Sequence, residues 1–111
     1  MKAYVLNKAG GTDVLTISDV ASTPVGSNEA RVRIETIGLN YAEIQSRKGL
    51  YGWAPKRPYI PGMEAYGKIE ALGEGVSHLQ VGTPVIVVGQ FGCYAEEVVV
   101  RVSQILPAFE N

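Results

Sequence analysis

The sequence predicts a mainly β fold, a small and partly open β-barrel that carries one short helix. The clearest strand is 30–36, where Ala30, Val32 and Ile34 share one face and charged side chains occupy the other. Glycine and proline separate this strand from several other short strand-like segments. Only the segment that begins at Asn40 has helix signals. With 111 residues, the chain is long enough for one domain with its own core and too short for two ordinary lobes.

The remaining strands are predicted from short runs between turn residues. The first run, 1–6, mixes polar and apolar residues and is followed by Gly10-Gly11, which favours a turn. A second strand is expected at 14–18, ahead of a loop around Pro24. Three further strands are expected at 65–72, 84–88 and 94–102, separated by turns that contain glycine and serine.

The helix is expected to run from Asn40 to about Lys48, and Gly49 stands where a left-handed C-terminal cap belongs. Asn40 and Glu43 have the spacing of a capping box. In that motif the Asn side chain accepts from the first free amides of the helix, and the Glu side chain reaches back to the cap. This structural role explains both residues without any ligand.

Composition excludes several classes of function. An apolar fraction of 46% and a charged fraction of 19% are typical of a globular protein and not of a disordered one. The net charge is -1 with Lys and Arg scattered along the chain, so nothing indicates a surface for nucleic acid or anionic lipid. The single cysteine, Cys93, excludes an internal disulfide and fits a reducing compartment. No apolar run suits a secretion signal or a membrane span, so the expected location is the cytoplasm.

Two motifs carry a resemblance to a known family, Ile37-Gly-Leu-Asn-Tyr-Ala-Glu-Ile-Gln-Ser-Arg-Lys-Gly-Leu-Tyr51 and Pro61-Gly-Met-Glu-Ala-Tyr-Gly67. They resemble the catalytic-domain signature of the medium-chain dehydrogenase/reductases, and more narrowly the zinc-independent quinone oxidoreductase type. Segments 67–85 and 92–97 are similar to the strands and the glycine turn that come next in this family. The resemblance covers nearly the whole chain. It implies that residues 1–111 are the N-terminal part of a GroES-like catalytic domain.

The resemblance also implies a missing part. Members of this family place a dinucleotide-binding Rossmann domain after this segment and then return to complete the catalytic domain. The nearest match to a nucleotide fingerprint in this chain is Gly73-Glu-Gly75-Val-Ser-His78, which has His78 at the third glycine position and no helix-length segment after it. A phosphate-binding loop needs a strand, a tight turn and a helix N-terminus, so we interpret this motif as a β-turn. NADPH or NADH is therefore expected to bind mainly to the missing domain, and the isolated chain is expected to be inactive.

The resemblance argues against zinc. In the zinc-dependent alcohol dehydrogenases a metal-binding Cys stands at the position of Asn40 and a metal-binding His at the position of Met63. An Asn amide and a thioether are poor zinc ligands, so we expect no metal site. Met63 is expected to fill apolar space, and a nearby donor is expected to hold Glu64. The only histidine, His78, lies in a polar turn with no Asp or Cys at ligand spacing.

Tyr51 is the first candidate for catalysis. By resemblance, its counterpart in quinone oxidoreductases approaches the nicotinamide and the substrate, where a phenol stacks on a flat ring or donates to a developing oxyanion. The resemblance makes Asn40 a catalytic and cofactor-binding candidate and Tyr41 a cofactor-binding one. Each has a structural alternative: Tyr51 as a half-buried loop residue, Asn40 as the helix cap, and Tyr41 packed under the helix. Trp53 either lines a hydrophobic substrate mouth or lies on the barrel.

Three functions remain open. The leading hypothesis is the N-terminal catalytic lobe of a zinc-independent, NAD(P)H-dependent quinone or enone oxidoreductase. The second is a non-catalytic GroES-like binding or assembly module. The third is a lobe of a zinc-dependent alcohol dehydrogenase, which Asn40 and Met63 oppose. Under the first hypothesis the expected substrate is a small-molecule quinone or enone. Self-association is also expected, through strand edges and apolar surface that the missing domain would cover.

Overall fold

The computed structural model describes residues 1–108, and residues 109–111 of the expected domain lie outside the described part. Short strands dominate this part, together with one α-helix, α1 (Tyr41–Lys48). The strands are β1 (Lys2–Leu6), β2 (Leu15–Asp19), β3 (Glu29–Ile37), β4 (Glu64–Leu72), β5 (Pro84–Val88), β6 (Glu97–Arg101) and β7 (Ile105–Pro107). Two 3-10 turns, Thr12–Val14 and Val102–Gln104, precede β2 and β7. The prediction of a mainly β fold with one short helix is confirmed.

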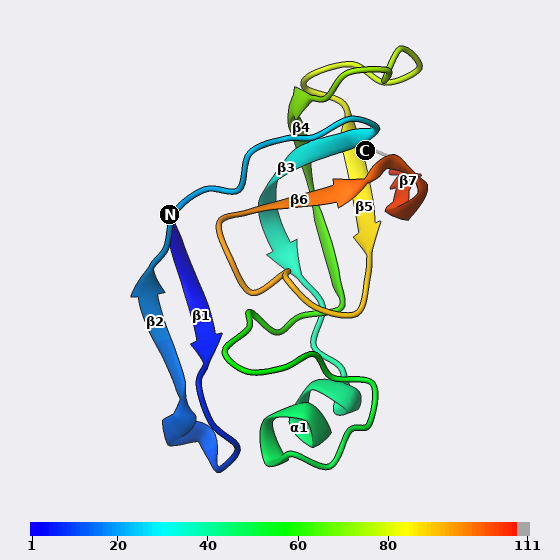
Figure 1. The fold of residues 1–111 in the computed structure, drawn as a ribbon. Coiled ribbons are helices and arrows are strands. Elements are labelled where there is room, and N and C mark those ends of the chain that lie inside the picture. Colours follow the sequence, from blue (N-terminus) through cyan, green and yellow to red (C-terminus); the bar gives the residue numbers. More distant parts are fainter. Residues whose placement is uncertain (109–111) are drawn as a thin grey trace.

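Five antiparallel strands form a curled half-barrel sheet in the order β6-β3-β4-β5-β7 (Figure 1). The longest pairing joins β3 to β4 and runs from Ala30 opposite Leu72 to Ile37 opposite Ala65. This pairing contains two register shifts, which bend a sheet and increase its twist. Gly67 lies at such a shift, where a side chain would collide with the Arg33 carbonyl group. The irregular register is therefore part of what curls the sheet.

The hydrophobic core lies on one face of this sheet. On β3, Ala30 and Val32 are fully buried and Ile34 packs against the core, whereas Arg33 and Glu35 are exposed. The alternation predicted for 30–36 is therefore confirmed. The buried members of the core are Val32, Ala65, Ile69, Val85, Val87, Cys93 and Val100. Burial of each Val or Ile side chain contributes about 1.5–3 kcal/mol, which makes this face the main support of the sheet.

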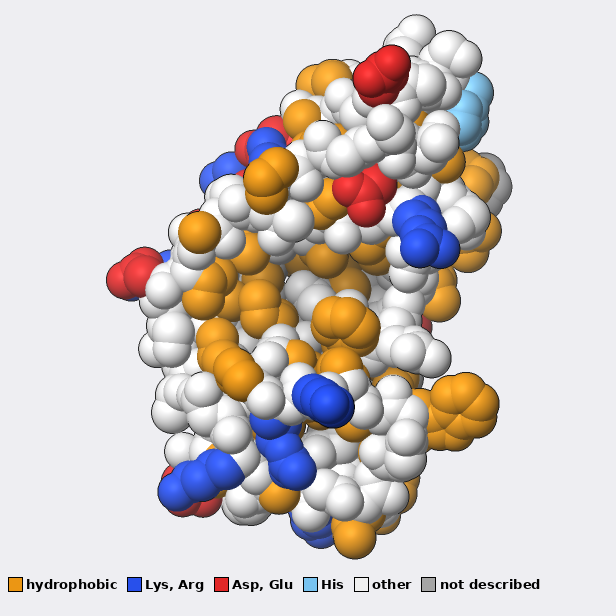
Figure 2. All heavy atoms as spheres, in the orientation of Figure 1, with side chains coloured by type: hydrophobic (Ala, Val, Ile, Leu, Met, Phe, Trp, Pro, Cys, Tyr) orange, Lys and Arg blue, Asp and Glu red, His pale blue; other side chains and the backbone are white. Residues whose placement is uncertain are grey.

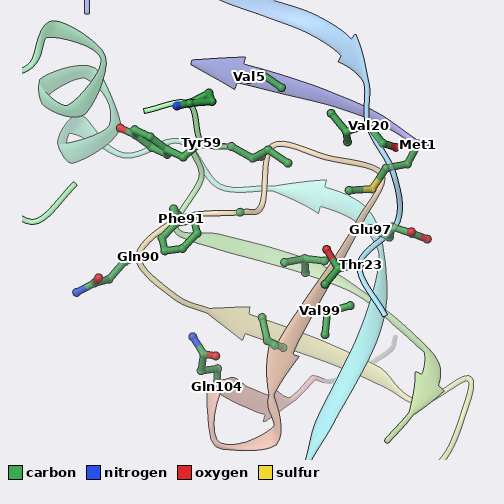
Figure 3. A pocket seen from close by; sticks show the side chains of 15 residues that line it. Met1, Val5, Val20, Thr23, Tyr59, Gln90, Phe91, Glu97, Val99 and Gln104 are labelled. Atoms are coloured by element: carbon green, nitrogen blue, oxygen red, sulfur yellow. Dashed lines mark hydrogen bonds between the residues drawn. The ribbon is translucent and has the colours of Figure 1, made fainter. Parts of the chain in front are cut away.

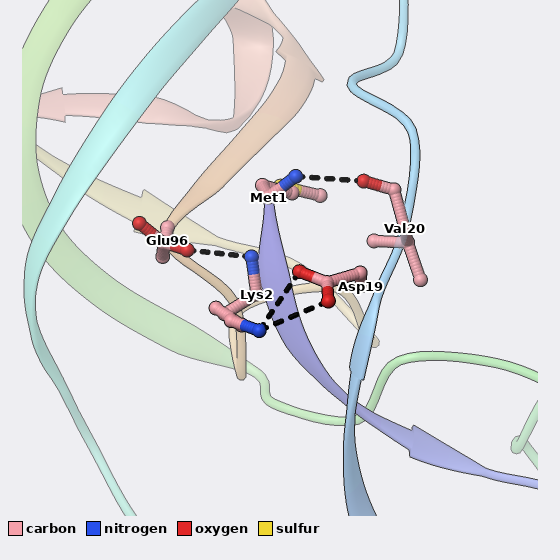
Figure 4. A network of polar contacts seen from close by, with 5 residues as sticks. All are labelled: Met1, Lys2, Asp19, Val20 and Glu96. Atoms are coloured by element: carbon pink, nitrogen blue, oxygen red, sulfur yellow. Dashed lines mark hydrogen bonds and ion pairs between the residues drawn. The ribbon is translucent and has the colours of Figure 1, made fainter.

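Strands β1 and β2 form a separate two-stranded ribbon beside the half-barrel (Figure 1). Such a ribbon is marginal on its own, and Figure 4 shows the polar contacts that support one end of it. The Lys2 backbone N–H donates to Glu96 Oε1 at 2.5 Å, and Lys2 Nζ lies 3.0 Å from each carboxylate oxygen of Asp19. The Met1 amino group donates to the Val20 carbonyl oxygen at 2.8 Å. The bond to Glu96 joins the ribbon to the segment that leads into β6, and the other contacts hold the two sides of the ribbon together.

Some boundaries differ from those predicted. β2 begins at Leu15, because Val14 ends a 3-10 turn. The strand predicted at 94–102 is shorter, since the Tyr94 N–H donates to the Pro61 carbonyl oxygen at 2.8 Å and draws this segment toward the turn before β4. β7 was not predicted and completes the sheet beside β5. Among the described residues, no helix has the length and apolar character needed to cross a membrane.

Candidate functional site

The candidate site is built on the start of α1, which follows β3 after a short connection. Asn40 is the N-cap, and its backbone N–H donates to Glu43 Oε1 at 2.8 Å. The Glu43 N–H donates to the Asn40 carbonyl oxygen at 3.1 Å. The prediction that Glu43 reaches back to the cap is therefore confirmed. At the other end Gly49 is left-handed, with φ of 80°, and its N–H donates to the carbonyl oxygen of Ser46 at 3.1 Å.

Glu43 also connects the helix to two other segments. The residue is only 6% exposed, and its Oε2 accepts from the Met63 backbone N–H at 2.9 Å. Its Oε1 accepts from the Tyr94 hydroxyl at 2.6 Å. One buried carboxylate thus joins the start of α1, the turn before β4 and the segment before β6. Hydrogen bonds to a charged group contribute about 1.5–3 kcal/mol each, so Glu43 strongly fixes the relative positions of these three segments.

The surroundings of Glu43 shift the pKa of two neighbours. Burial and the hydrogen bond to Glu43 raise the pKa of Tyr94 far above its usual value, which keeps this phenol protonated as a donor. Burial, followed by the negative charges of Glu43 and Glu64, raises the pKa of Cys93 to about 11. A thiol with so high a pKa is a poor nucleophile near neutral pH. Cys93, at 1% exposed, is a small core residue.

The turn before β4 tolerates little change. Gly62 has φ of 109°, a conformation that favours glycine, and a Cβ atom there would lie 2.6 Å from Tyr94 Cδ1. Gly38 is less constrained, because a side chain at this position would overlap only the exposed Glu64 side chain, which can move. Met63 is half-buried and Glu64 is exposed. The donor expected for the Glu64 side chain is not found within residues 1–108.

The three candidate residues flank α1 at one end of the molecule. Tyr41 is the first residue of α1 and is 70% exposed, so it does not pack under the helix. Tyr51 follows the helix and is half-buried, as is Asn40 before it. The helix has eight residues, which rise about 12 Å along its axis. Asn40 and Tyr51 therefore lie at opposite ends of α1. No hydrogen bond joins these three side chains, and both phenol hydroxyls lack a partner within residues 1–108.

The described residues can be compared with what a metal ion and a dinucleotide each require. Within residues 1–108, no group of three or more His, Cys, Asp or Glu side chains is placed to hold an ion. Tyr41 and Tyr51 offer flat apolar faces and unbonded hydroxyls, which suit a nicotinamide ring. The pyrophosphate has no comparable cradle. Residues 74–75 form a turn between β4 and β5, and no helix follows them before β5.

A sizeable cavity lies elsewhere in the molecule. It has a volume of about 670 Å³ and opens between the β1–β2 ribbon, β6 and the loop before β6. Figure 3 shows its mainly apolar walls, with Val5, Val20 and Phe91 around it and the Glu97 carboxylate directed away from Phe91. None of the three candidate residues lines this cavity. Its lining includes the polar residues Tyr59, Gln90, Glu97 and Gln104, but because it lies apart from the candidate residues we do not assign it as the catalytic site.

Sequence reasoning missed two residues that build the site. Glu43 was interpreted only as a helix cap, although it also bonds to Met63 and Tyr94. Tyr94 was not singled out at all. Its only sequence signal is its place in Gly92-Cys-Tyr-Ala, a run similar to a strand entry of the family. The contact joins positions 51 residues apart, which local patterns do not reveal.

Comparison with known proteins places this arrangement in a family. The alcohol dehydrogenase GroES-like domain family matches residues 26–110. The synaptic vesicle membrane protein VAT-1 homolog of Danio rerio is 41% identical over 100 residues, which are 89% of this chain. Quinone oxidoreductase-like protein 2 of Mus musculus is 41% identical over 83 residues, or 75% of this chain. The chain spans only 21% and 24% of the lengths of these two relatives.

Solved structures have the same fold. Human synaptic vesicle membrane protein VAT-1 homolog-like protein matches with a TM-score of 0.94 and 30% identity, over 99% of this chain and 35% of its own. Escherichia coli quinone oxidoreductase complexed with NADPH matches with a TM-score of 0.90 and 27% identity, over 96% of this chain and 33% of its own. The chain therefore belongs to the alcohol dehydrogenase GroES-like domain family, and through it to the medium-chain dehydrogenase/reductases of the quinone oxidoreductase type.

Proposed function

We propose that the chain is the N-terminal catalytic lobe of a zinc-independent, NAD(P)H-dependent oxidoreductase that reduces quinones or electron-poor enones in the cytoplasm. A structural neighbour bound to NADPH, of which the chain matches 33%, supports this cofactor. The dinucleotide-binding domain of such an enzyme lies in other residues. The isolated chain is accordingly expected to be inactive.

The observation that carries the proposal is a rigid support beside two unbonded phenols. Glu43 holds the start of α1 against the turn that contains Met63. Tyr41 begins α1 at this support, Tyr51 follows the other end of the helix, and both hydroxyls lack a partner within residues 1–108. Stabilisation of a developing negative charge requires donors that are positioned before the reaction, on elements that do not move.

The proposed chemistry assigns one task to each candidate residue. A bound nicotinamide cofactor supplies the hydride. Tyr51 donates a hydrogen bond to the carbonyl oxygen of the quinone or enone as negative charge develops on it. Asn40 offers an amide donor and acceptor to a planar polar group, and Tyr41 covers an apolar face of the ligand. Polarisation then depends on hydrogen bonds and on positioning, without a metal as Lewis acid.

The first test is a calorimetric titration with NADPH. It compares the 111-residue chain with a longer protein that adds a dinucleotide-binding domain. We expect no binding by the chain, and both binding and quinone reduction by the longer protein. Binding by the chain alone would contradict this division between two domains. Absence of binding by both proteins would favour the alternative of a non-catalytic GroES-like module.

The role of Tyr51 is tested with Tyr51→Phe in the longer protein. Loss of an oxyanion donor is expected to lower kcat by about 10²–10³-fold, with little change in NADPH affinity. Tyr4→Phe is the matched control, because Tyr4 lies on β1. An unchanged kcat for Tyr51→Phe would show that this residue takes no part in the chemistry.

Zinc independence is tested by measuring the metal content of the active longer protein. Stoichiometric zinc would contradict it.

A further inference from the structure

Half of the cations of this chain gather at one end of the folded molecule. This α1 end consists of residues 7–14, between β1 and β2, and residues 39–58, which contain α1. The two segments are joined by hydrogen bonds from the Gly10 N–H to the Arg47 carbonyl oxygen, at 2.9 Å, and from Arg47 Nε to the Gly10 carbonyl oxygen, at 3.3 Å. Figure 2 shows Lys and Arg side chains grouped over this lower end of the molecule.

The charge of the α1 end is opposite in sign to that of the rest. It holds five of the ten Lys and Arg residues and two of the eleven Asp and Glu residues. One of its acids, Glu43, is buried and already bonded. Within residues 1–108, none of its cations belongs to an ion pair. These cations are Lys8, Arg47, Lys48, Lys56 and Arg57.

The same end carries the most exposed large apolar side chains of the described chain. Leu39, Tyr41, Leu50 and Trp53 are 78%, 70%, 71% and 72% exposed. Elsewhere in residues 1–108 the highest such exposure is that of Val81, at 64%. Single exposed apolar residues are common on protein surfaces, but several at one end, together with cations outside any ion pair, suit an interaction surface.

We propose that the α1 end docks on an anionic lipid surface. Trp and Tyr prefer the level of the headgroups, and exposed apolar residues such as Leu50 enter the boundary with the acyl chains. Lys and Arg around them are attracted to negative headgroups. The α1 end is positive and the rest of the chain is negative, so a negatively charged surface attracts the α1 end and turns it toward the surface. The proposal shares only Tyr41 with the proposed reductase site and rests mainly on Leu39, Leu50, Trp53 and the cations, and it differs from the sequence-based expectation of no lipid surface.

Lipid fits this end better than other anionic partners. A nucleic acid or an acidic peptide satisfies the cations but presents a solvated surface to Leu39 and Leu50. An anionic bilayer satisfies both kinds of side chain at once, because phosphates and carboxylates lie directly above an apolar layer. Because cations and exposed apolar side chains occur together at this end, a lipid surface fits it better than a nucleic acid or an acidic peptide.

Trp53 is the only tryptophan of the chain, so its fluorescence reports directly on this end. The chain is mixed with vesicles of phosphatidylcholine alone or of phosphatidylcholine with phosphatidylserine. We expect a blue shift of the emission and co-sedimentation with the anionic vesicles only, both reversed by high salt. Absence of the shift, or equal binding to both kinds of vesicle, would overturn the proposal.

Variants locate the surface. Lys48→Gln and Arg57→Gln are each expected to weaken vesicle binding about fivefold, the effect of removing one cation near an anionic surface. Leu50→Ser is expected to weaken binding and to reduce the blue shift. The matched controls, Arg101→Gln at the end of β6 and Val81→Ser in the β4–β5 connection, are expected to change neither. Equal loss in the controls would overturn the assignment to the α1 end.

Two competing occupants are measured in parallel. Polyglutamate is titrated as an acidic polypeptide, and a longer protein that contains this chain is sedimented with the same vesicles. Binding to polyglutamate but not to vesicles would assign the end to an acidic protein. Loss of vesicle binding in the longer protein would show that other residues cover the end. Either result overturns the lipid proposal.

Discussion

Glu43 is a charged residue with almost no access to solvent, and only its hydrogen bonds offset the free energy that burial of its charge costs. Three donors meet its two oxygens: the N–H groups of Asn40 and Met63 and the Tyr94 hydroxyl. A single side chain therefore sets the geometry of the start of α1 and of the turn before β4. The positions of the nearby candidate residues depend on it.

Glu43→Gln is expected to destabilise the fold by about 1–3 kcal/mol, because an amide has one acceptor oxygen and sets an NH₂ group against a donor. Urea unfolding measures the loss as a lower midpoint. Glu74→Gln, an exposed position whose side chain makes no hydrogen bond within residues 1–108, is the matched control. Equal midpoints for the two variants would show that the three bonds to Glu43 contribute little.

Cys93 makes the fold sensitive to alkaline pH. Its pKa is about 11 in the folded chain against 9.0 for an unperturbed thiol. The stability that depends on the protonated thiol is complete below pH 9 and is lost as the pH rises through the folded value, because the unfolded chain loses this proton first. The decrease is about 2–3 kcal/mol.

Urea unfolding at a series of alkaline pH values measures this decrease. Cys93→Ala is expected to remove part of the pH dependence, and Tyr94, whose pKa is also raised, contributes a further part. A thiol reagent is expected to react with Cys93 only after unfolding. Parallel pH profiles for the two chains, or rapid reaction with the folded protein, would contradict the assignment.

At the scale of elements, local patterns and long-range contacts contribute differently. The alternation in 30–36 predicted β3 because one face of that strand is buried and the other is not. Helix signals at Asn40 and Gly49 predicted the bounds of α1 closely, since caps act within one turn. β7 has three residues and exists only because β5 lies beside it, so no local pattern indicates it.

Ile69→Ala is expected to cost about 2–5 kcal/mol, because Ile69 on β4 is 2% exposed and truncation leaves a cavity between packed strands. Ile17→Ala makes the same chemical change on β2, where the residue is 60% exposed, and is expected to change stability by less than about 0.5 kcal/mol. Denaturant unfolding compares the two variants. Similar losses at both positions would show that the half-barrel core does not dominate the stability.

At the scale of the whole molecule, the half-barrel has open sides. Among residues 1–108, β6 pairs with β3 alone and β7 pairs with β5 alone, so in this part of the chain each has one edge without a partner strand. The apolar cavity of about 670 Å³ opens beside β6. Unpaired edges next to apolar surface favour association between chains.

The isolated chain is therefore expected to self-associate as its concentration rises. Sedimentation velocity measures this, and Val99→Lys on β6 is expected to weaken the association. Val88→Lys on β5 is the matched control, because β5 has a partner strand on each side. A monomer at every concentration would show that these open sides do not drive association.

Much of the fold was predictable, and less of the site. The turn that follows β4 was correctly separated from a nucleotide loop, because a phosphate cradle needs a helix that the sequence does not provide there. The exposed position of Tyr41 was not predicted, since a helical tyrosine packs or projects according to what lies beside the helix. The assignments of Asn40, Tyr41 and Tyr51 to catalysis and cofactor binding remain predictions.

The sequence by itself determined the kind of fold, the helix with its two caps, the buried face of β3 and the family. These depend on residue types at short spacing, which local sterics and hydrogen bonding convert directly into structure. The tertiary structure alone decided that Glu43 bonds to Met63 and Tyr94, and that five scattered cations share one end with Leu50 and Trp53. Such groups form only when distant segments pack together, because the distance along the chain does not give the distance in space.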